Sequence, residues 1–351
     1  MKKLHVIKTL IVILILFIFN GCGILAHNIY SYAFDRYDEV PDDEFDTYIK
    51  WKHVDQGRYP RETVYFDSGG NTLQGFVYGE SNSKGLVIIS QGWLNTADRY
   101  LPLIMFFADN GWRVFAYNNT GVSGSEGESV RGLVQSLLDL KAALDYVNNS
   151  NALNNLPVML LGHSWGGFAA CAVLNFDYDI KAVVSNAGYN NGSDVIDKLS
   201  EESAGFLYRL ISGRVRIIEK QLFGDAVYLT AVDGINNTNI PVMIIQSSDD
   251  DVIFADSISI YAHRDKITNP NAQIVFLDGE NAAGHGFVFY TNEQREYANW
   301  AESNWKTYKR RKRNPSARQW EQDVNFDVLL ANQLNIGLME RINEFFLNAM
   351  K

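Results

Sequence analysis

From residue 63 onward, short runs of β-branched and apolar residues alternate along the chain with longer stretches of helical periodicity. This alternation is typical of an α/β domain with a largely parallel sheet. Continuously apolar runs such as Val158–Leu161 predict strands that are covered on both faces. Eight strands are expected: Thr63–Phe66, Leu73–Tyr78, Leu86–Ser90, Arg113–Tyr117, Val158–Leu161, Lys181–Ser185, Val242–Gln246 and Gln273–Leu277.

The turn-forming residues 67–71, with the sequence DSGGN, separate the first two predicted strands. They predict an antiparallel hairpin at the edge of the sheet. Between the later strands, apolar residues recur with helical spacing, which predicts helices at Tyr100–Asp109, Leu133–Val147, Gly166–Leu174 and Ala255–Ile267. The pattern therefore places a sheet with helices on both faces over residues 62–351.

Two segments of this domain are not needed for the sheet. The stretch at about residues 190–238 is too long for a structureless loop and is expected to fold as a small helical cap. An extension at about residues 287–351 carries the basic run Lys309–Arg313 and a predicted amphipathic helix over Phe326–Met350. A solvated face is the expected role of the basic run, and contact with anionic lipid headgroups is the alternative.

Residues 1–25 have the composition of an export signal, in which Lys2, Lys3 and Lys8 precede the apolar run Thr9–Phe19. Gly21 before Cys22 resembles the cleavage box of bacterial lipoproteins, which makes Cys22 the candidate for lipid attachment. An uncleaved N-terminal membrane anchor and free secretion are the alternatives. We expect a domain exported and anchored to the bacterial cell envelope, with residues 26–61 as a spacer.

Composition narrows the classes of partner. The net charge of −10 argues against nucleic acid, because an acidic surface repels phosphate. The chain holds two cysteines and no CxxC or HExxH spacing, so neither a disulfide framework nor a metal site is expected. Cys171 stands among small apolar residues and is expected to be a core residue.

The sequence Gly162-His163-Ser164-Trp165-Gly166 follows a predicted strand and opens a predicted helix. A G-x-S-x-G sequence in this context predicts a sharp turn that exposes a nucleophilic serine, here Ser164. Gly162 and Gly166 supply the small neighbours that such a turn requires. The N-terminus of the helix favours the negative charge that develops during attack.

A serine hydroxyl needs an oriented base. His285 follows the last predicted strand, whereas His5, His27 and His53 precede the sheet, His163 lies within the turn itself and His263 lies on a helical stretch. Three acids, Asp249, Asp250 and Asp251, follow the strand Val242–Gln246. Spacing favours Asp250 as the partner of His285, with Asp249 as the alternative, and Asp251 is expected to begin the next turn.

Acyl transfer also needs backbone N–H donors for the oxyanion. The residue after the nucleophile, Trp165, is one candidate. The loop after the third strand, Ser90-Gln91-Gly92-Trp93, is expected to supply the other through the N–H of Trp93.

Five motifs now stand in order: Gln91-Gly92-Trp93, residues 120–127 (TGVSGSEG), the serine turn, Ser248-Asp249-Asp250 and Gly284-His285-Gly286. Together they resemble the α/β-hydrolase superfamily, most closely the branch of serine aminopeptidases, monoacylglycerol lipases and small esterases. The resemblance covers roughly Thr63 to Gly286 and implies an α/β-hydrolase fold whose catalytic groups follow in the order serine, acid, histidine. Gln91 stands where a histidine is usual and Ser247 where a glycine is usual, which bears on the substrate more than on catalysis.

These observations favour a serine hydrolase that cleaves carboxylic esters through an acyl-enzyme, acting on a small-molecule or lipid-like acyl substrate. Peptide or other amide cleavage by an aminopeptidase-like enzyme is the alternative. A non-catalytic surface binding protein on a hydrolase scaffold is the third reading, and the complete set of motifs argues against it. The mechanism needs no metal or organic cofactor.

Overall fold

The computed structural model describes residues 23–24, 26–38, 47–204, 208–312 and 326–351. The expected export signal and its Cys22 fall almost wholly outside these residues. In the described ranges, no helix combines the length and the apolar character that crossing a membrane requires.

An eight-stranded sheet forms the centre of the domain, with the strand order β1-β2-β4-β3-β5-β6-β7-β8. β1 and β2 form the expected antiparallel hairpin at one edge, and β2 also pairs with β4 in antiparallel orientation. The strands from β4 to β8 in this order are parallel to one another. All eight predicted strands are confirmed, as β1 (Arg61–Ser68), β2 (Asn71–Tyr78), β3 (Leu86–Ser90), β4 (Arg113–Tyr117), β5 (Val158–His163), β6 (Ile180–Asn186), β7 (Val242–Ser247) and β8 (Ala272–Leu277).

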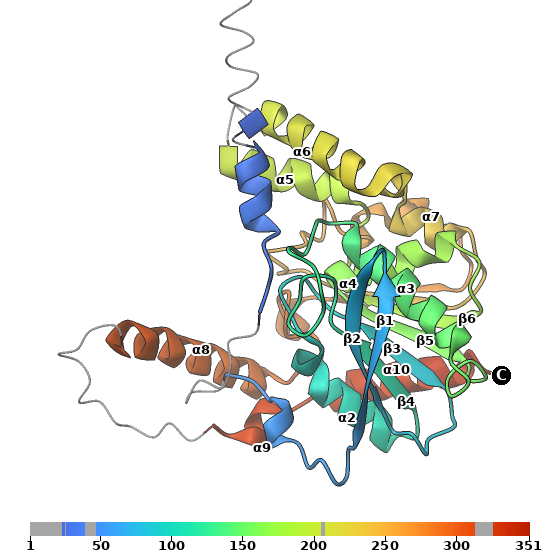
Figure 1. The fold of residues 1–351 in the computed structure, drawn as a ribbon. Coiled ribbons are helices and arrows are strands. Elements are labelled where there is room, and N and C mark those ends of the chain that lie inside the picture. The colour runs from blue at the N-terminus through green and yellow to red at the C-terminus, as the bar shows by residue number, and fades with distance from the viewer. Residues whose placement is uncertain (1–22, 25, 39–46, 205–207, 313–325) are drawn as a thin grey trace, which may run out of the picture.

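Helices cover both faces of this sheet (Figure 1). On one face, α3 (Gln135–Asn149) and α4 (Trp165–Ala172) bury their apolar side chains in one hydrophobic cluster. On the other face, α2 (Leu101–Asp109) and α10 (Ile336–Asn348) contribute to a second cluster. Two separate cores explain why the central strands are apolar at every position, since each strand contributes side chains to both.

The expected cap is present between β6 and β7. It consists of α5 (Gly192–Ala204), α6 (Tyr208–Phe223) and the shorter α7 (Ala231–Asn236). α5 and α6 lie together as a layer at one end of the sheet (Figure 1).

The prediction of a helix over Ala255–Ile267 is wrong. Only a short 3-10 helix, Tyr261–Lys266, forms there. The backbone before it pairs with the segment after β6 instead. Asn190 N–H donates to the Ile258 carbonyl at 3.0 Å, and Ile260 N–H donates to the Gly188 carbonyl at 2.9 Å. Tertiary pairing has therefore replaced the helical ladder that the local pattern favours.

The single C-terminal helix predicted over Phe326–Met350 is also wrong in its extent. The structure has α9 (Val328–Ala331) and α10, separated by a break at residues 332–335. Asn335 accepts a hydrogen bond from Leu338 N–H at 3.2 Å and so caps α10, while its own N–H donates to the Phe289 carbonyl at 2.9 Å. An asparagine whose side chain caps the N-terminus of a helix marks the start of that helix, so α10 is separate from α9.

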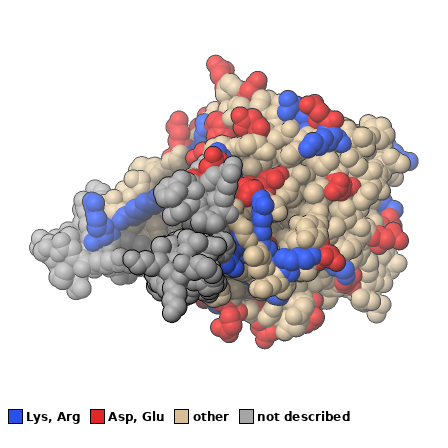
Figure 2. Space-filling model, turned by 90° about the horizontal axis from the view of Figure 1, so that it is seen from above, with Lys and Arg blue, Asp and Glu red and all other residues tan. Residues whose placement is uncertain are grey.

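The basic run lies at the end of α8 (Asn292–Lys312), with Arg313 outside the described residues. Arg310 is exposed, and the exposed Lys306 one turn earlier pairs with Glu302 at 2.9 Å. Acidic and basic side chains are interspersed over the face of the molecule seen from above (Figure 2). The solvated face expected for this run agrees with the exposure of Arg310.

The segment expected to be a spacer is packed against the domain in its described parts. Residues 26–33 form a helix, called here the N-terminal helix, and its Ala26 and Tyr30 are buried in the same cluster as α3 and α4, together with Phe34 just beyond it. Ile49 and Val54 are buried in the other cluster. The overall polar and acidic composition of this segment suggested a spacer, because its few buried apolar side chains contribute little to that composition.

Tyr30 links the N-terminal helix to the cap. Its hydroxyl donates to the buried Glu219 carboxylate on α6 at 2.6 Å, and Leu133 N–H donates to the same oxygen at 3.1 Å. Burial raises the pKa of Glu219, and the hydrogen bonds from Tyr30 and Leu133 oppose this effect. Both hydrogen bonds are therefore needed to compensate a carboxyl group that has left water.

Tyr30→Phe is expected to lower the free energy of unfolding by about 1–3 kcal/mol, because it leaves a buried acceptor without its shorter hydrogen bond. Tyr32→Phe is the matched control, since Tyr32 lies on the same helix and is 88% exposed. Urea unfolding of both variants measures the difference, and equal stability of the two would show that the Tyr30–Glu219 contact contributes nothing.

Candidate active site

Ser164 stands on the sharp turn that the sequence predicts. β5 ends at His163, α4 begins at Trp165, and Ser164 between them has φ 55° and ψ −113°. A positive φ is strained for a residue with a side chain and is typical of a nucleophile on such a turn. A Cβ atom on Gly162 would lie 2.1 Å from the Gly166 carbonyl oxygen, so the turn closes only with glycine there.

Three side chains form a continuous hydrogen-bonded chain. His285 Nε2 lies 2.9 Å from Ser164 Oγ, and His285 Nδ1 lies 3.0 Å from each oxygen of Asp250. Because a carboxylate only accepts, Nδ1 carries the hydrogen and Nε2 is left to accept from the serine hydroxyl. These three residues are far apart in the chain and meet at the carboxyl ends of β5, β7 and β8.

Asp250 is held firmly in its place. It is 4% exposed, and its Oδ1 accepts from Val252 N–H at 3.0 Å and from Ile253 N–H at 2.8 Å. Gln246 Nε2 donates to its Oδ2 at 3.1 Å. These donors are neutral, so they stabilise the buried carboxylate and leave its negative charge to interact with His285.

The alternative acid, Asp249, has a different partner. Its Oδ1 accepts from Gly284 N–H at 2.8 Å and from Ser247 Oγ at 2.6 Å. Ser247 Oγ in turn accepts from Ala283 N–H at 2.8 Å. Asp249 therefore holds the backbone just before His285, and Asp251 is exposed.

The two candidate oxyanion donors lie on adjoining stretches of backbone. A Cβ atom on Gly166, one residue after Trp165, would lie 2.0 Å from the Ser90 carbonyl oxygen and 2.8 Å from that of Gln91. Trp165 is the first residue of α4, and the first N–H groups of a helix have no partner within it. These contacts bring the loop that carries Trp93 against the start of α4.

The indole rings of the two tryptophans lie in different surroundings. Trp165 is 1% exposed, and its indole N–H donates to the Leu133 carbonyl at 2.7 Å. Trp93 is partly exposed, and its ring lies 5.5 Å from that of Phe34. Trp165 can thus offer the site only its backbone N–H, while the Trp93 ring packs beside the segment that follows the N-terminal helix.

Sequence reasoning missed the role of His163 and Tyr100. Tyr100 Oη lies 2.9 Å from His163 Nδ1 and accepts from Gly92 N–H at 2.8 Å, and His163 Nε2 lies 3.0 Å from the His285 carbonyl oxygen. Since Gly92 N–H is engaged in this way, Trp93 supplies the next N–H of the loop. No pattern around Tyr100 distinguishes it from other core residues of a helix.

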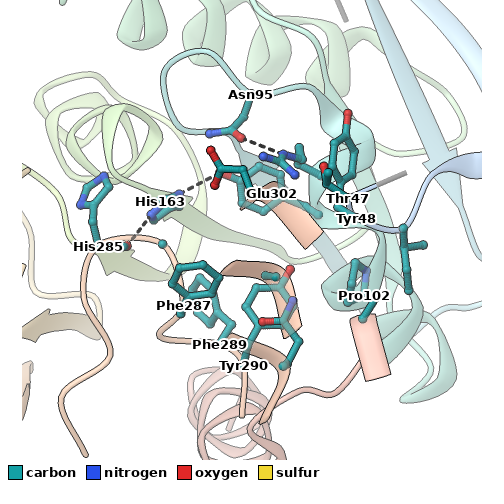
Figure 3. Close-up of a pocket in the computed structure, with 17 residues that line it drawn as sticks. Thr47, Tyr48, Asn95, Pro102, His163, His285, Phe287, Phe289, Tyr290 and Glu302 are labelled. Atoms are coloured by element: carbon teal, nitrogen blue, oxygen red, sulfur yellow. Dashed lines mark hydrogen bonds between the residues drawn. The ribbon is translucent and has the colours of Figure 1, made fainter. Parts of the chain in front are cut away.

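A cavity of about 260 Å³ opens beside the two histidines. Figure 3 shows His163 and His285 at one end and Phe287, Phe289 and Tyr290 along its side. Asn95, Arg99 and Glu302 add polar groups to its wall. The cavity joins the catalytic loops to α8, which belongs to the C-terminal extension. Among the described residues, no group of three or more His, Cys, Asp or Glu side chains is placed to hold a metal ion.

One known protein family matches part of this chain. A sequence model of the family described as serine aminopeptidase, S33, matches residues 81–217. The matched stretch includes the loop after β3 and the serine turn but ends before Asp250 and His285. The uncharacterized protein YfhR of Salmonella typhi is 24% identical over 213 residues, which are 57% of this chain and 65% of that protein. This chain thus spans just under two thirds of that relative.

Solved structures share the architecture. The esterase Pf2001 of Pyrococcus furiosus superposes with a TM-score of 0.54 at 17% identity, over 79% of this chain and 98% of that chain. The acylaminoacyl peptidase of Pyrococcus horikoshii gives a TM-score of 0.50 at 15% identity, over 78% of this chain and 44% of that chain. The chain has the α/β-hydrolase fold. At these identities the structural likeness establishes the hydrolase fold and leaves the substrate open.

Cys171, the cysteine within the described residues, is a core residue, as predicted. Cys171 is fully buried on α4, and burial raises the pKa of its thiol to about 12. A thiol with that pKa is neutral at physiological pH and is a poor nucleophile.

His163 makes the free energy of unfolding of the domain depend on pH. Burial, with a smaller contribution from His285, lowers its pKa from 6.5 to about 4. Between these values the unfolded chain binds a proton that the folded chain does not. The free energy of unfolding therefore falls by roughly 3 kcal/mol as the pH drops from 6.5 to 4, and is unaffected by this group above 6.5.

Since His163→Gln lacks the titrating imidazole, the wild type should lose roughly 3 kcal/mol more stability than this variant between pH 7 and pH 4. Denaturant unfolding of both proteins at a series of pH values measures the difference. A stability difference that stays constant over this range would contradict a buried, neutral His163.

Proposed function

We propose that this chain hydrolyses carboxylic esters through an acyl-enzyme formed on Ser164. The observation that carries the proposal is the Ser164–His285–Asp250 hydrogen-bond chain, at 2.9 and 3.0 Å, with the serine on a strained turn at a helix N-terminus. A serine with an oriented imidazole is the arrangement that acyl transfer requires.

In the first half of the reaction, Ser164 Oγ attacks the ester carbonyl carbon while His285 Nε2 takes the hydroxyl proton. Asp250 keeps the imidazole in the tautomer that accepts this proton and stabilises the imidazolium that forms. The backbone N–H groups of Trp93 and Trp165 are proposed to bind the oxyanion. Collapse of the tetrahedral intermediate breaks the bond to the alcohol, which leaves with the proton from His285.

In the second half, His285 takes a proton from water as the water attacks the acyl carbon. The bond to Ser164 Oγ then breaks, the acid leaves, and the proton returns to the serine oxygen. The same groups thus serve both halves, and atoms and charges balance without a cofactor.

Amide cleavage is the second candidate, because the matching family is described as serine aminopeptidase. A peptidase of this type must bind a charged amino terminus near the nucleophile. Asp249 and Asp250, the acids beside His285, are both engaged by hydrogen bonds from the histidine, its loop or neighbouring backbone. Glu302 in the cavity wall pairs with Lys306 at 2.9 Å. The engagement of these three acids supports a neutral acyl group and hence the ester.

A panel of p-nitrophenyl esters of increasing chain length and aminoacyl anilides tests this choice. We expect turnover of at least one ester and much slower turnover of the anilides. Turnover of the anilides alone would contradict the ester and favour the amide, and Ser164→Ala serves as the blank in every assay.

We also propose that residues 1–25 export the domain and that Cys22 carries the lipid that anchors it to the cell envelope. This proposal rests on the sequence of that segment, since Cys22 lies outside the described residues. The mass of the N-terminal peptide from protein purified out of membranes tests it. A diacylated peptide beginning at Cys22 is expected, whereas an unmodified chain beginning at Met1 would overturn lipidation.

A further inference from the structure

His163 and Tyr100 connect the two loops that the reaction depends on. The loop after β3 carries Gly92 and the proposed oxyanion donor Trp93, and the loop after β8 carries His285. Tyr100 is fixed at the start of α2 and is 6% exposed, and His163 is the last residue of β5 and is 8% exposed. Both side chains are thus anchored in regular structure and project between the loops.

The direction of each hydrogen bond follows from its fixed partners. The His285 carbonyl oxygen can only accept, so His163 Nε2 carries the hydrogen of that 3.0 Å contact. Nδ1 is then an acceptor and receives the Tyr100 hydroxyl hydrogen at 2.9 Å. The Tyr100 oxygen receives Gly92 N–H at 2.8 Å. The result is a one-way chain from Gly92 through Tyr100 and His163 to the peptide of His285.

Three side chains hold peptide groups of the histidine loop, in addition to Arg295, which donates to the Ala282 carbonyl at 3.0 Å. Ala283 N–H donates to Ser247 Oγ and Gly284 N–H donates to Asp249 Oδ1, both at 2.8 Å. His163 provides the third contact, and among the described residues it is the side chain that holds the carbonyl group of His285 itself. Of these three supports, only His163 also reaches the loop after β3.

Close packing shows that this link is tight. A Cβ atom on Gly92 would lie 3.0 Å from His163 Nδ1 and 3.3 Å from Tyr100 Oη, so only glycine lets the loop approach the pair without strain. The rings of His163 and His285 lie 5.1 Å apart. A protonated His163 at that distance would repel the imidazolium that forms on His285 during attack, whereas a neutral one does not.

We propose that Tyr100 and His163 act as one positioning unit, which sets the separation between the oxyanion loop and the His285 loop. The proposal rests on the proposed acyl transfer at Ser164. Neither residue touches the reacting atoms in this account. Their effect is to keep the Trp93 N–H and the His285 imidazole aligned with the same carbonyl group, and misalignment by about 1 Å costs about 10²-fold in rate.

Three variants break the unit at different points. Tyr100→Phe removes both contacts of the hydroxyl. His163→Asn keeps an acceptor near the Nδ1 position and loses the donor to His285, whereas His163→Gln keeps a donor near Nε2 and loses the acceptor for Tyr100. Tyr178→Phe is the matched control. The Tyr178 hydroxyl donates to Asp145 at 2.6 Å, and Tyr178 lies just before the amino end of β6, whereas the site lies at the carboxyl ends of the strands.

We expect Tyr100→Phe and His163→Asn each to lower kcat for the best p-nitrophenyl ester by about 10- to 100-fold with less than about threefold change in KM. His163→Gln should recover part of the loss, because it can still hold the His285 peptide. If the two residues act as one unit, the double variant Tyr100→Phe/His163→Asn is no slower than the slower single variant. Tyr178→Phe should keep wild-type kcat.

Losses that multiply in the double variant, or kcat within about twofold of wild type in both single variants, would overturn the proposal. Nitrogen NMR of the wild type provides a test that needs neither variant folding nor turnover. We expect His163 as the Nε2–H tautomer with Nδ1 accepting, and the Nδ1–H tautomer would overturn the unit. Failure of the proposed function would instead appear as wild-type protein that has this tautomer and hydrolyses no ester.

Discussion

Ser164→Ala is expected to lower kcat/KM for the best ester substrate by about 10⁵-fold, because it removes the atom that forms the acyl-enzyme. The residual rate is expected to exceed that of water alone, since the oxyanion donors and the binding site remain. Steady-state assays of purified protein measure it, with care that no wild-type enzyme contaminates the variant.

Ser123→Ala is the control for this variant. Ser123 lies in the glycine-rich loop after β4 and, like Ser164, has a positive φ, of 48°. Both substitutions therefore place alanine at a residue with positive φ. Activity within about twofold of wild type is expected for Ser123→Ala. A Ser164→Ala protein that keeps more than about a tenth of the wild-type rate would remove Ser164 from the mechanism.

Asp250→Asn is expected to lower kcat by about 10⁴-fold while the protein remains folded. The amide oxygen can still accept from Val252 and Ile253 N–H, which donate to Asp250 Oδ1. The amide nitrogen takes the place of Oδ2, so it loses the hydrogen bond from Gln246 Nε2. It faces His285 Nδ1 and donates to it, which leaves the proton on the nitrogen that should accept from Ser164. Steady-state kinetics and a circular dichroism spectrum test the two parts of this expectation.

Asp249→Asn provides the comparison, because the two acids are adjacent and the sequence favours Asp250 but leaves Asp249 as the alternative. Asp249 Oδ1 accepts from Ser247 Oγ and Gly284 N–H, and an asparagine oxygen can accept both. We expect less than about a tenfold loss in kcat. A larger loss in Asp249→Asn than in Asp250→Asn would reverse the assignment of the acid.

The central strands could be predicted closely from the sequence because they are buried on both faces. β3 and β4 have the predicted ends, Leu86–Ser90 and Arg113–Tyr117. Such strands stand out as short apolar runs between polar turns, so their ends are marked by composition alone. Ser164 was predictable for a related reason, since the strand, turn and helix that expose it are consecutive in the chain.

Contacts between distant segments could not be predicted. Residues 255–260 have a helical pattern but pair with residues 188–190 after β6, which only the fold brings near. Tyr100 and His163 are separated by 63 positions, and Tyr30 and Glu219 by 189. Local patterns record burial and turns, but they do not record which buried polar groups find each other.

The N-terminal helix shows the consequence of such contacts for the site. Tyr30 reaches Leu133 through Glu219, and the Leu133 carbonyl accepts from the Trp165 indole. Phe34 packs against the Trp93 ring. The segment that follows the proposed anchor is therefore in direct contact with Trp93 and is linked to Trp165 through Glu219 and Leu133.

Labelling by a fluorophosphonate probe tests the central claim most directly, because the probe reacts with a serine only where an oriented base and oxyanion donors activate it. Purified folded protein is treated with the probe, digested and analysed by mass spectrometry. The account predicts one adduct, on the peptide that contains Ser164, and none after prior denaturation or in Ser164→Ala. Folded protein without an adduct on Ser164 would contradict it.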